Sequence, residues 1–253
     1  MVIWPQTLYA CVTPEIYKYK LIDDINLKLY IYRPKNDASG SYEHPAIVFF
    51  HGGAWRGGSH KQFSGQATWL CQNAGLVAIS VEYRANSNPQ SSVDDAIDAF
   101  SWVRQHQMKF RIRPDRIAIS GGSAGGQLAI ITTILSESKF MQTPNSLILF
   151  NPVVNLNGKW ERTFGRRLSQ ISPLQLMDAP LPPTLIMHGT KDDIVKIKEV
   201  RTFVAKAKKV QTSNITLIEY QGRKHAFFNK DWRGDKSSTT LNVYNFLSDL
   251  GWF

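Results

Sequence analysis

A serine flanked by glycines lies where a predicted strand runs into a predicted helix. Residues 121–125 read Gly-Gly-Ser-Ala-Gly, the pattern G-x-S-x-G, between an apolar run at 116–120 and a helical pattern at 124–136. A serine on such a sharp turn leaves no room for neighbouring side chains, and the first amides of the helix face any negative charge that develops there. The pattern predicts that Ser123 is a catalytic nucleophile. The alternative is a glycine-rich phosphate loop, but the segment lacks the Lys-Ser/Thr of a P-loop and the spacing G-x-G-x-x-G.

Candidate partners for this serine follow later in the chain. A serine nucleophile needs a base, and the base needs a carboxylate that orients it. On a strand-turn-helix scaffold the expected order is Ser, then Asp or Glu, then His. Asp192, Asp193 and His225 come in that order, each after a predicted strand. Either aspartate could orient the imidazole of His225, and spacing does not separate them. We interpret His188, at the end of a strand, as a structural histidine.

An early glycine-rich loop can supply hydrogen-bond donors to an oxyanion. Residues 51–55 read His-Gly-Gly-Ala-Trp and directly follow an apolar run at 46–50. Acyl transfer needs backbone amides aimed at the developing charge, one of them from the residue after the nucleophile, Ala124. Two adjacent glycines let the loop turn its amides toward one point. An ordinary glycine-rich β-turn is the alternative.

Alternating strands and helices surround these residues. Residues 17–32 alternate apolar and polar side chains, which predicts half-buried antiparallel strands. Later strands are continuous apolar runs, typical of a parallel sheet covered by helices on both faces. They are expected at 46–50, 75–81, 116–120, 146–150, 183–188 and 215–218, and further helices at 93–103, 198–210 and 237–250. Ser91 is expected to cap the first of these helices.

This order of elements predicts one α/β domain over residues 1–253, built on a mixed, mostly parallel sheet. The connection between the predicted strands at 146–150 and 183–188 is longer than most connections. We therefore expect it to be an insertion over the sheet rather than a bare loop.

Composition excludes several classes of protein. Apolar residues make up 43% and charged residues 20% of the chain, so disorder, collagen and coiled coil are excluded. The net charge of +10 raises the question of anionic partners, but the basic residues are scattered and no nucleic-acid-binding module accompanies them. We predict no nucleic-acid partner. No apolar run approaches the ~20 residues of a membrane span, and no ligand cluster or dinucleotide loop predicts a metal or cofactor.

The N-terminal sequence and the two cysteines give expectations about the compartment and about thiol chemistry. The N-terminus lacks the basic head and long apolar body of a signal peptide, which indicates a cytoplasmic protein. A secreted or periplasmic protein from which a signal had been removed would look the same. Cys11 and Cys71 are too few for a disulfide framework and lie in no metal-ligand spacing. We expect both to be small buried hydrophobic residues rather than reactive thiols.

Taken together, these segments resemble the α/β-hydrolase superfamily, and within it the hormone-sensitive-lipase-like esterases, especially the small bifunctional feruloyl and acetylxylan esterases. The resemblance covers nearly the whole chain and rests on H-G-G-A-W-R-G-G-S at 51–59, V-E-Y-R at 81–84, D-R-I-A-I-S-G-G-S-A-G-G at 115–126, S-P at 172–173, the stretch 183–192 and H-A-F-F-N at 225–229. It implies an α/β-hydrolase fold with an eight-stranded, mostly parallel sheet, helices on both faces and a short inserted segment after the sixth strand.

The same resemblance assigns roles within the site. It implies that the acid is Asp192 rather than Asp193. It also implies that the amides of Gly53 and Ala54 bind the oxyanion together with that of Ala124, with Gly52 able to share the work. The chain departs from most hormone-sensitive-lipase relatives at Ala54, where they carry a third glycine. H-G-G-A-W is the form of the polysaccharide-esterase branch and of some peptidase-like and formamidase-like relatives.

By resemblance, Trp55 and the inserted segment, including Trp160, would line the substrate pocket. Packing beneath the oxyanion loop is an equal alternative for Trp55. Arg162, Arg166 and Arg167 lie in the insertion and would form a basic rim that favours acidic sugars or carboxylated aromatics, or else an ordinary solvated face.

The predicted function is hydrolysis of carboxylic esters with short or aromatic acyl groups, such as acetyl or feruloyl, on a small molecule or a polysaccharide. Ser123, His225 and Asp192 would act through an acyl-enzyme. A peptidase or amidase of the same fold is the alternative. A non-enzymatic binding domain is disfavoured because degenerate members usually lose a residue of the triad.

Overall fold

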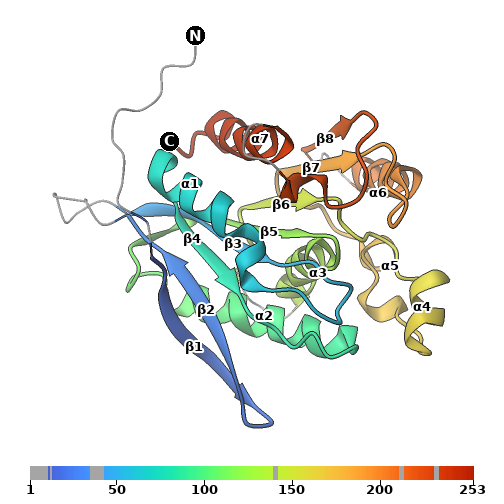
Figure 1. Ribbon diagram of the computed structural model, residues 1–253, viewed down its shortest axis with the longest axis horizontal. Helices are drawn as coiled ribbons and strands as arrows, with labels where there is room; N and C mark the ends of the chain where they lie inside the picture. The colour runs from blue at the N-terminus through green and yellow to red at the C-terminus, as the bar shows by residue number, and fades with distance from the viewer. Residues whose placement is uncertain (1–10, 12, 35–42, 139–141, 211–213, 231–233) are drawn as a thin grey trace.

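The computed structural model describes residues 11, 13–34, 43–138, 142–210, 214–230 and 234–253. One eight-stranded sheet runs through it in the order β1-β2-β4-β3-β5-β6-β7-β8 (Figure 1). Its strands are β1 (Glu15–Ile22), β2 (Ile25–Tyr32), β3 (His44–Phe50), β4 (Val77–Val81), β5 (Ile112–Gly122), β6 (Ser146–Phe150), β7 (Thr184–Gly189) and β8 (Ile215–Tyr220). The pairs β1–β2 and β2–β4 are antiparallel, and the remaining pairs are parallel. The predicted α/β-hydrolase fold is confirmed.

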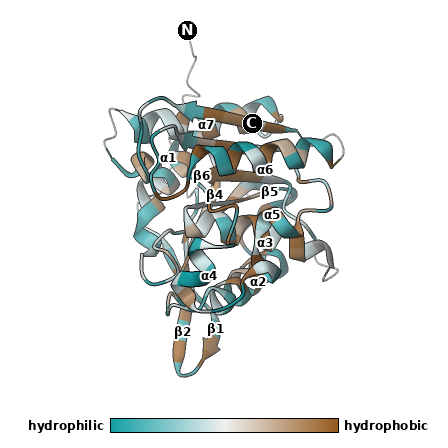
Figure 2. Ribbon diagram, turned by 90° about the vertical axis from the view of Figure 1, so that its right-hand side faces the viewer, coloured by the Kyte–Doolittle hydropathy of each residue, from teal (hydrophilic) through white to brown (hydrophobic). Residues whose placement is uncertain are grey.

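Burial along the strands follows their sequence patterns. Strands β3, β4, β6 and β7, which are continuous apolar runs, are buried along their whole length. Strands β1 and β2 alternate in sequence and are only partly buried. They form a hairpin that projects from the body of the molecule in both views (Figures 1 and 2). The carboxyl ends of the parallel strands share one edge of the sheet, where sites of such folds collect.

Helices cover both faces of the sheet and enclose two apolar cores. The helices are α1 (Ser64–Ala74), α2 (Pro89–Gln105), α3 (Ala124–Ser138), α4 (Lys159–Phe164), α5 (Pro173–Leu176), α6 (Ile197–Lys209) and α7 (Asp235–Asp249), with 3-10 turns η1 (His60–Phe63), η2 (Ser169–Ile171) and η3 (Phe227–Asn229). Buried side chains of α2, α3 and α6 belong to one core. Those of α1 and α7 belong to the other, so the sheet is enclosed between two helical layers.

Two details refine the predicted elements. The connection between β6 and β7 carries α4, η2 and α5, as expected of an insertion after the sixth strand. The predicted cap of α2 is wrong, because the helix begins one turn earlier, at Pro89, with Asn88 as its N-cap. Proline at the first helical position has its φ already set for a helix, so it moves the start upstream. Ser91 lies inside the first turn, and its hydroxyl donates to the Asn88 carbonyl (2.9 Å).

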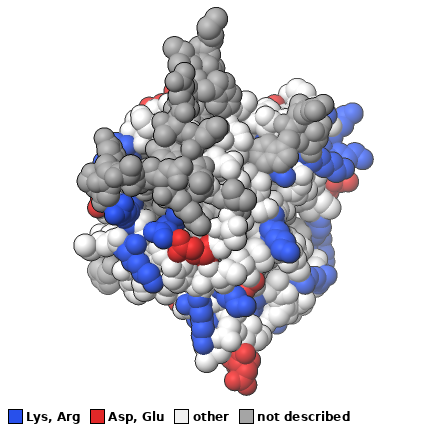
Figure 3. Space-filling view, turned by 60° about the vertical axis from the view of Figure 1, so that its left-hand side comes forward, with Lys and Arg blue, Asp and Glu red and all other residues white. Residues whose placement is uncertain are grey.

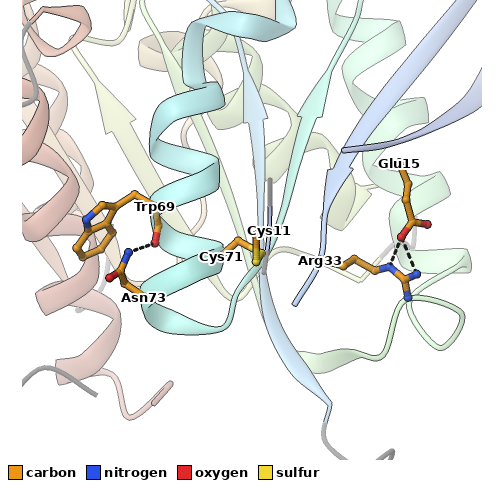
Figure 4. Close-up of a disulfide and its surroundings, with 6 residues drawn as sticks. All are labelled: Cys11, Glu15, Arg33, Trp69, Cys71 and Asn73. Carbon is orange, nitrogen blue, oxygen red and sulfur yellow. Dashed lines mark hydrogen bonds and ion pairs between the residues drawn. A yellow bond between two sulfur atoms is a disulfide. The ribbon is translucent and has the colours of Figure 1, made fainter. Parts of the chain in front are cut away.

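Cys11 and Cys71 form a disulfide bond (Figure 4). It links Cys11 to α1, with the two Cα atoms 6.0 Å apart across a sequence separation of 60 residues. Both side chains are buried, as predicted, but the expectation of two separate apolar cysteines is wrong. Nothing in their spacing reveals the pair, because only the tertiary fold brings Cys11 against α1.

The surface charge and the helix lengths bear on anionic partners and on membranes. On the face seen in Figure 3, lysine and arginine side chains form separate groups, with uncharged surface and some acidic side chains between them. Positive charge is therefore spread over this face rather than concentrated in one patch. Within the described ranges, no helix is both long and apolar enough to span a bilayer.

Candidate active site

Ser123 lies on a tight turn between β5 and α3, in a left-handed backbone conformation (φ 55°). Its amide donates to the Phe150 carbonyl (2.9 Å), which ties the turn to the end of β6. A Cβ on Gly121 would lie 2.2 Å from the Gly125 carbonyl oxygen, and a Cβ on Gly125 would lie 2.1 Å from the Phe50 carbonyl oxygen. Only glycine fits at either position. The G-x-S-x-G spacing thus reflects close backbone packing that leaves one half-exposed side chain, that of Ser123.

The structure brings Ser123, His225 and Asp192 together from the ends of three different strands. His225 Nε2 lies 2.8 Å from Ser123 Oγ, and His225 Nδ1 lies 2.7 Å from Asp192 Oδ2. Asp193 is exposed to solvent. Of the two aspartates that spacing left equivalent, the fold therefore places Asp192 beside the imidazole. In such an arrangement the serine oxygen can attack as a nucleophile while the imidazole accepts the serine proton.

Asp192 is buried (3% exposed) and is nevertheless held as a carboxylate. Its Oδ1 accepts hydrogen bonds from the amides of Ile194 and Val195, each 2.9 Å long. Burial opposes ionisation, but the hydrogen bonds from His225 and from the Val195 amide outweigh it and hold the pKa of Asp192 below its usual value. An ionised carboxylate only accepts, so His225 carries its proton on Nδ1. Nε2 is then free to accept from the Ser123 hydroxyl.

His188 lies behind this carboxylate and is fully buried. Its Nε2 donates to the Val195 carbonyl (2.9 Å) and lies 3.4 Å from Asp192 Oδ2. Burial lowers the pKa of His188, against the opposing effects of that carbonyl and of the Asp192 charge. A neutral imidazole packed against the acid loop agrees with the structural role that the sequence indicated.

The loop at residues 51–55, here called the oxyanion loop for the role that the resemblance implied, lies directly over Ser123, since a Cβ on Gly52 would be 3.3 Å from Ser123 Cβ. The Gly52 amide donates to the Gln62 side chain (2.6 Å), so it is occupied and does not share the work of binding an oxyanion. No hydrogen bond joins the amides of Gly53, Ala54 or Ala124 to an acceptor in the described part of the chain. These three are the donors that the resemblance implied, and they are available to a ligand.

Three amide side chains that the motifs did not identify hold the loops of the site. Asn151 accepts from the Ala226 amide beside His225, Gln62 accepts from the Gly52 amide, and Gln127 accepts from the indole N–H of Trp55. The sequence positions of two of these residues, Asn151 and Gln127, could have indicated that they lie near the site. Asn151 directly follows a buried strand and Gln127 is the second residue after the G-x-S-x-G motif, both positions at the site edge of the sheet. Nothing local distinguishes Gln62.

Both tryptophans named as substrate contacts are turned into the protein. Trp55 is fully buried and packs edge-on against Trp160 of α4, with ring centroids 5.2 Å apart. Its position corresponds to the packing alternative. Trp160 is itself buried (8% exposed), so it is placed to support Trp55 rather than to meet a substrate.

The three arginines of the insertion, Arg162, Arg166 and Arg167, are exposed on α4 and the turn after it. Arg166 Nη1 donates to Asn88 Oδ1 (3.0 Å), so it bridges the insertion to the start of α2. Contact between these arginines and a substrate stays a prediction. Within the described residues there is no cluster of three or more His, Cys, Asp or Glu side chains that could hold a metal ion.

Comparison with known proteins agrees with this geometry. Residues 47–169 match a family described as alpha/beta hydrolase fold. The structure of the thermophilic esterase Est2 from Thermogutta terrifontis is 34% identical with a TM-score of 0.84, and the alignment covers 95% of this chain and 94% of that one. Its propionate-bound form is 35% identical with a TM-score of 0.84, covering 95% and 96%.

A curated relative is longer than this chain. Esterase LipC from Mycobacterium tuberculosis is 27% identical over 214 residues, which make up 72% of this chain and 53% of LipC. The chain thus spans about half the length of the curated relatives it matches. The match to Est2 extends over nearly all of both chains, at an identity well above the level at which only the fold is shared. The chain therefore belongs to the α/β-hydrolase-fold family.

Proposed function

We propose that this chain is a serine esterase that hydrolyses carboxylic esters, with Ser123 as nucleophile, His225 as general base and acid, and Asp192 as the group that orients the imidazole. One observation carries the proposal. A half-exposed serine is hydrogen-bonded to an imidazole that is hydrogen-bonded to a buried carboxylate, beside three backbone amides that have no acceptor in the described chain. The esterases among its relatives support the same reaction.

The proposed reaction has two halves. Ser123 Oγ attacks the ester carbonyl as His225 Nε2 takes its proton, and the resulting oxyanion accepts hydrogen bonds from the amides of Gly53, Ala54 and Ala124. His225 then gives that proton to the departing alcohol, which leaves an acyl-serine. Water attacks the acyl-serine in the same manner, releasing the acid and restoring the serine. Each oxyanion donor contributes on the order of 3 kcal/mol in enzymes where single donors have been removed.

We propose short acyl groups as the substrate class. The propionate-bound structure of Est2 supports this choice, because propionate has the size of a short acyl product. The burial of Trp55 and Trp160 also supports it, since neither ring offers a broad aromatic face on which a feruloyl group could stack. Acetyl groups on a polysaccharide remain within the proposed class, whereas feruloyl esters are expected to be poorer substrates.

We further propose that the protein works in an oxidising compartment. The Cys11–Cys71 disulfide supports this, because disulfides persist outside the reducing cytoplasm. Rapid alkylation of cells that produce the protein, followed by mass measurement, would count the free thiols. Two alkylated cysteines in the native host would contradict the proposal.

Initial rates on a panel of substrates test the function. The panel comprises p-nitrophenyl acetate, butyrate and octanoate, methyl ferulate, acetylated xylan and an aminoacyl anilide. We expect the acetate and butyrate to be hydrolysed fastest and Ser123→Ala to abolish the activity. Turnover confined to the anilide would instead indicate a peptidase or amidase, and activity that survives in Ser123→Ala would refute the serine mechanism.

The neighbouring aspartates provide a matched pair for the acid. Asp192→Asn removes the carboxylate that fixes the imidazole tautomer, and such a loss lowers kcat on the order of 10⁴-fold where it has been measured. Asp193→Asn changes an exposed carboxylate one residue away and should leave kcat unchanged. Equal effects of the two substitutions would contradict the assignment of Asp192.

A further inference from the structure

Gln127 is a fully buried amide side chain that joins three segments around the site. It lies in the first turn of α3, and its backbone amide donates to the Ser123 carbonyl (3.2 Å). Its Oε1 accepts from Trp55 Nε1 (3.1 Å) and its Nε2 donates to the Ile171 carbonyl (2.8 Å). We infer that Gln127 is a positioning residue that, through Trp55, holds the oxyanion loop in the geometry that binds the transition state. The inference rests on the proposed esterase function and deepens it.

The oxyanion loop needs support because its backbone is strained. Gly53, Ala54 and Trp55 have φ values of 129°, 53° and 56°, so three consecutive residues lie at positive φ. For alanine and tryptophan this conformation is unfavourable, and it persists only where surrounding contacts impose it. The two loop amides proposed to bind the oxyanion, those of Gly53 and Ala54, lie within this stretch. Any relaxation of the strain would move them.

Trp55 is the point at which the fold restrains the strained stretch. Its carbonyl accepts from the Ser87 amide (2.8 Å), and its indole N–H has Gln127 Oε1 as its acceptor. The indole is fully buried, so losing that acceptor would leave an unpaired donor away from water. The ring would then shift to find a partner, and the backbone of Trp55 would move with it.

The inserted segment completes the support from the other side. Trp160 and Phe164 of α4 both meet Trp55 edge-on, with ring centroids 5.2 and 5.7 Å away. Gln127 itself bonds to the insertion, at the Ile171 carbonyl of η2. One amide thus connects the nucleophile helix, the oxyanion loop and the insertion. This arrangement assigns the insertion a supporting role beneath the loop.

The expected effect falls on the chemical step. Displaced oxyanion donors bind the tetrahedral transition state less well, whereas the ground-state ester, which has no full negative charge, is bound much as before. Loss of Gln127 should therefore lower kcat and leave KM nearly unchanged. A small displacement of positioning groups can change rates on the order of 10- to 100-fold.

Gln127→Leu tests this, because leucine is similar in size and can neither donate nor accept. The matched control is Thr133→Val, which also removes a buried polar group from α3. The Thr133 hydroxyl donates to the Ala129 carbonyl of its own helix (2.9 Å), so it joins no other segment. The measurements are kcat and KM on p-nitrophenyl acetate and Ki for a trifluoromethyl ketone, whose serine adduct places an oxyanion in the loop. Stoichiometric phosphorylation by an organophosphate counts the active sites, so loss of folded enzyme is not mistaken for loss of rate.

For Gln127→Leu we expect kcat to fall on the order of 10- to 100-fold, KM to stay within about twofold, and Ki to rise by the factor by which kcat falls. Thr133→Val should leave all three at wild-type values. An unchanged kcat, or a fall in kcat with Ki unchanged, would overturn the inference.

Trp55→Phe gives a second route to the same test, should Gln127→Leu fail to fold. It keeps an aromatic ring against α4 and removes only the N–H donor. The same fall in kcat and rise in Ki is expected. Because both substitutions break the hydrogen bond between Trp55 Nε1 and Gln127 Oε1, the double variant should be no slower than the slower single variant, and additive losses would contradict the inference. Ester hydrolysis that survives in Ser123→Ala would refute the proposed function, whereas a normal Gln127→Leu beside an inactive Ser123→Ala would refute the positioning role alone.

Discussion

The side chain of Asn151 accepts a hydrogen bond from the backbone amide of Ala226 (3.1 Å), so the residue directly after β6 holds the residue that follows His225. Both residues have a positive φ, 36° for Asn151 and 59° for Ala226. Asn151 is itself fixed, since its backbone amide donates to the Met187 carbonyl of β7 (2.8 Å). The position of His225, the proposed base, is therefore set by the sheet and not by its own loop alone.

Asn151→Ala should lower activity by releasing the loop of His225. We expect kcat to fall on the order of tenfold, since the imidazole would lose its alignment with Ser123. Asn145→Ala is the matched control, because Asn145 Oδ1 accepts from the Ile117 amide (2.9 Å) just before β6, at the end of the strand remote from the site. Each substitution removes one side-chain acceptor from a backbone amide. If steady-state kinetics show the same kcat for both variants at equal folded concentration, the positioning role of Asn151 is wrong.

Gly57 and Gly58 should respond differently to alanine. A Cβ on Gly58 would lie 2.1 Å from the Gly52 carbonyl oxygen and 2.4 Å from His51 Nδ1, at a φ of 104° that alanine rarely adopts. No atom lies within 4 Å of the position that a Cβ on Gly57 would take. Gly58→Ala must displace the oxyanion loop and should lose most of its kcat/KM, whereas Gly57→Ala should stay close to wild type. Comparable kcat/KM values for the two variants would show that the loop tolerates this displacement.

Buried His188 should make the protein less stable in mild acid. Burial lowers the pKa of His188 in the folded state, while the unfolded chain takes up the proton near the ordinary value of about 6.5. The unfolded state therefore binds more protons as the pH falls below about 6.5, and stability falls by up to about 1.4 kcal/mol per pH unit until the folded pKa is reached.

Urea unfolding at pH 7.5 and pH 5.5 measures this loss, and His188→Gln should reduce it. Some loss should remain in the variant, because burial also lowers the pKa of His51 and of His60. Ser120→Ala, a buried and non-titrating change in β5, should alter the free energy of unfolding equally at the two pH values. An undiminished difference between the two pH values in His188→Gln would rule out His188 as a source of the acid sensitivity.

The Cys11–Cys71 disulfide should stabilise the protein against unfolding. It closes a loop across 60 residues, and bonds of this kind contribute about 2–4 kcal/mol, mainly by restricting the unfolded chain. Addition of the reductant TCEP should lower the free energy of unfolding of the wild type by about that amount. The double variant Cys11→Ser/Cys71→Ser should match the reduced wild type and not respond to TCEP. Equal stability of oxidised and reduced wild type, with thiol labelling to prove reduction, would contradict this prediction.

Much of this molecule follows from short stretches of sequence, because their constraints are local. The glycines at 121 and 125 are required by contacts of the turn that displays Ser123, so this serine, the proposed nucleophile, is visible as a motif. The buried strands are visible as continuous apolar runs because a parallel sheet covered on both faces buries every side chain. The order of serine, acid and histidine follows from the order of the strands that carry them.

What only the tertiary structure decided depends on contacts between distant segments. Spacing left Asp192 and Asp193 equivalent, and the direction of the loop after β7 places Asp192 beside His225. The cysteines gave no sign of a pair, and the fold places Cys11 beside Cys71 of α1. In the sequence Gln127 is one residue of a predicted helix, and only the fold places the indole of Trp55 against its side chain. A motif records what a residue requires of its immediate neighbours, whereas a hydrogen bond across the fold depends on how every intervening element packs.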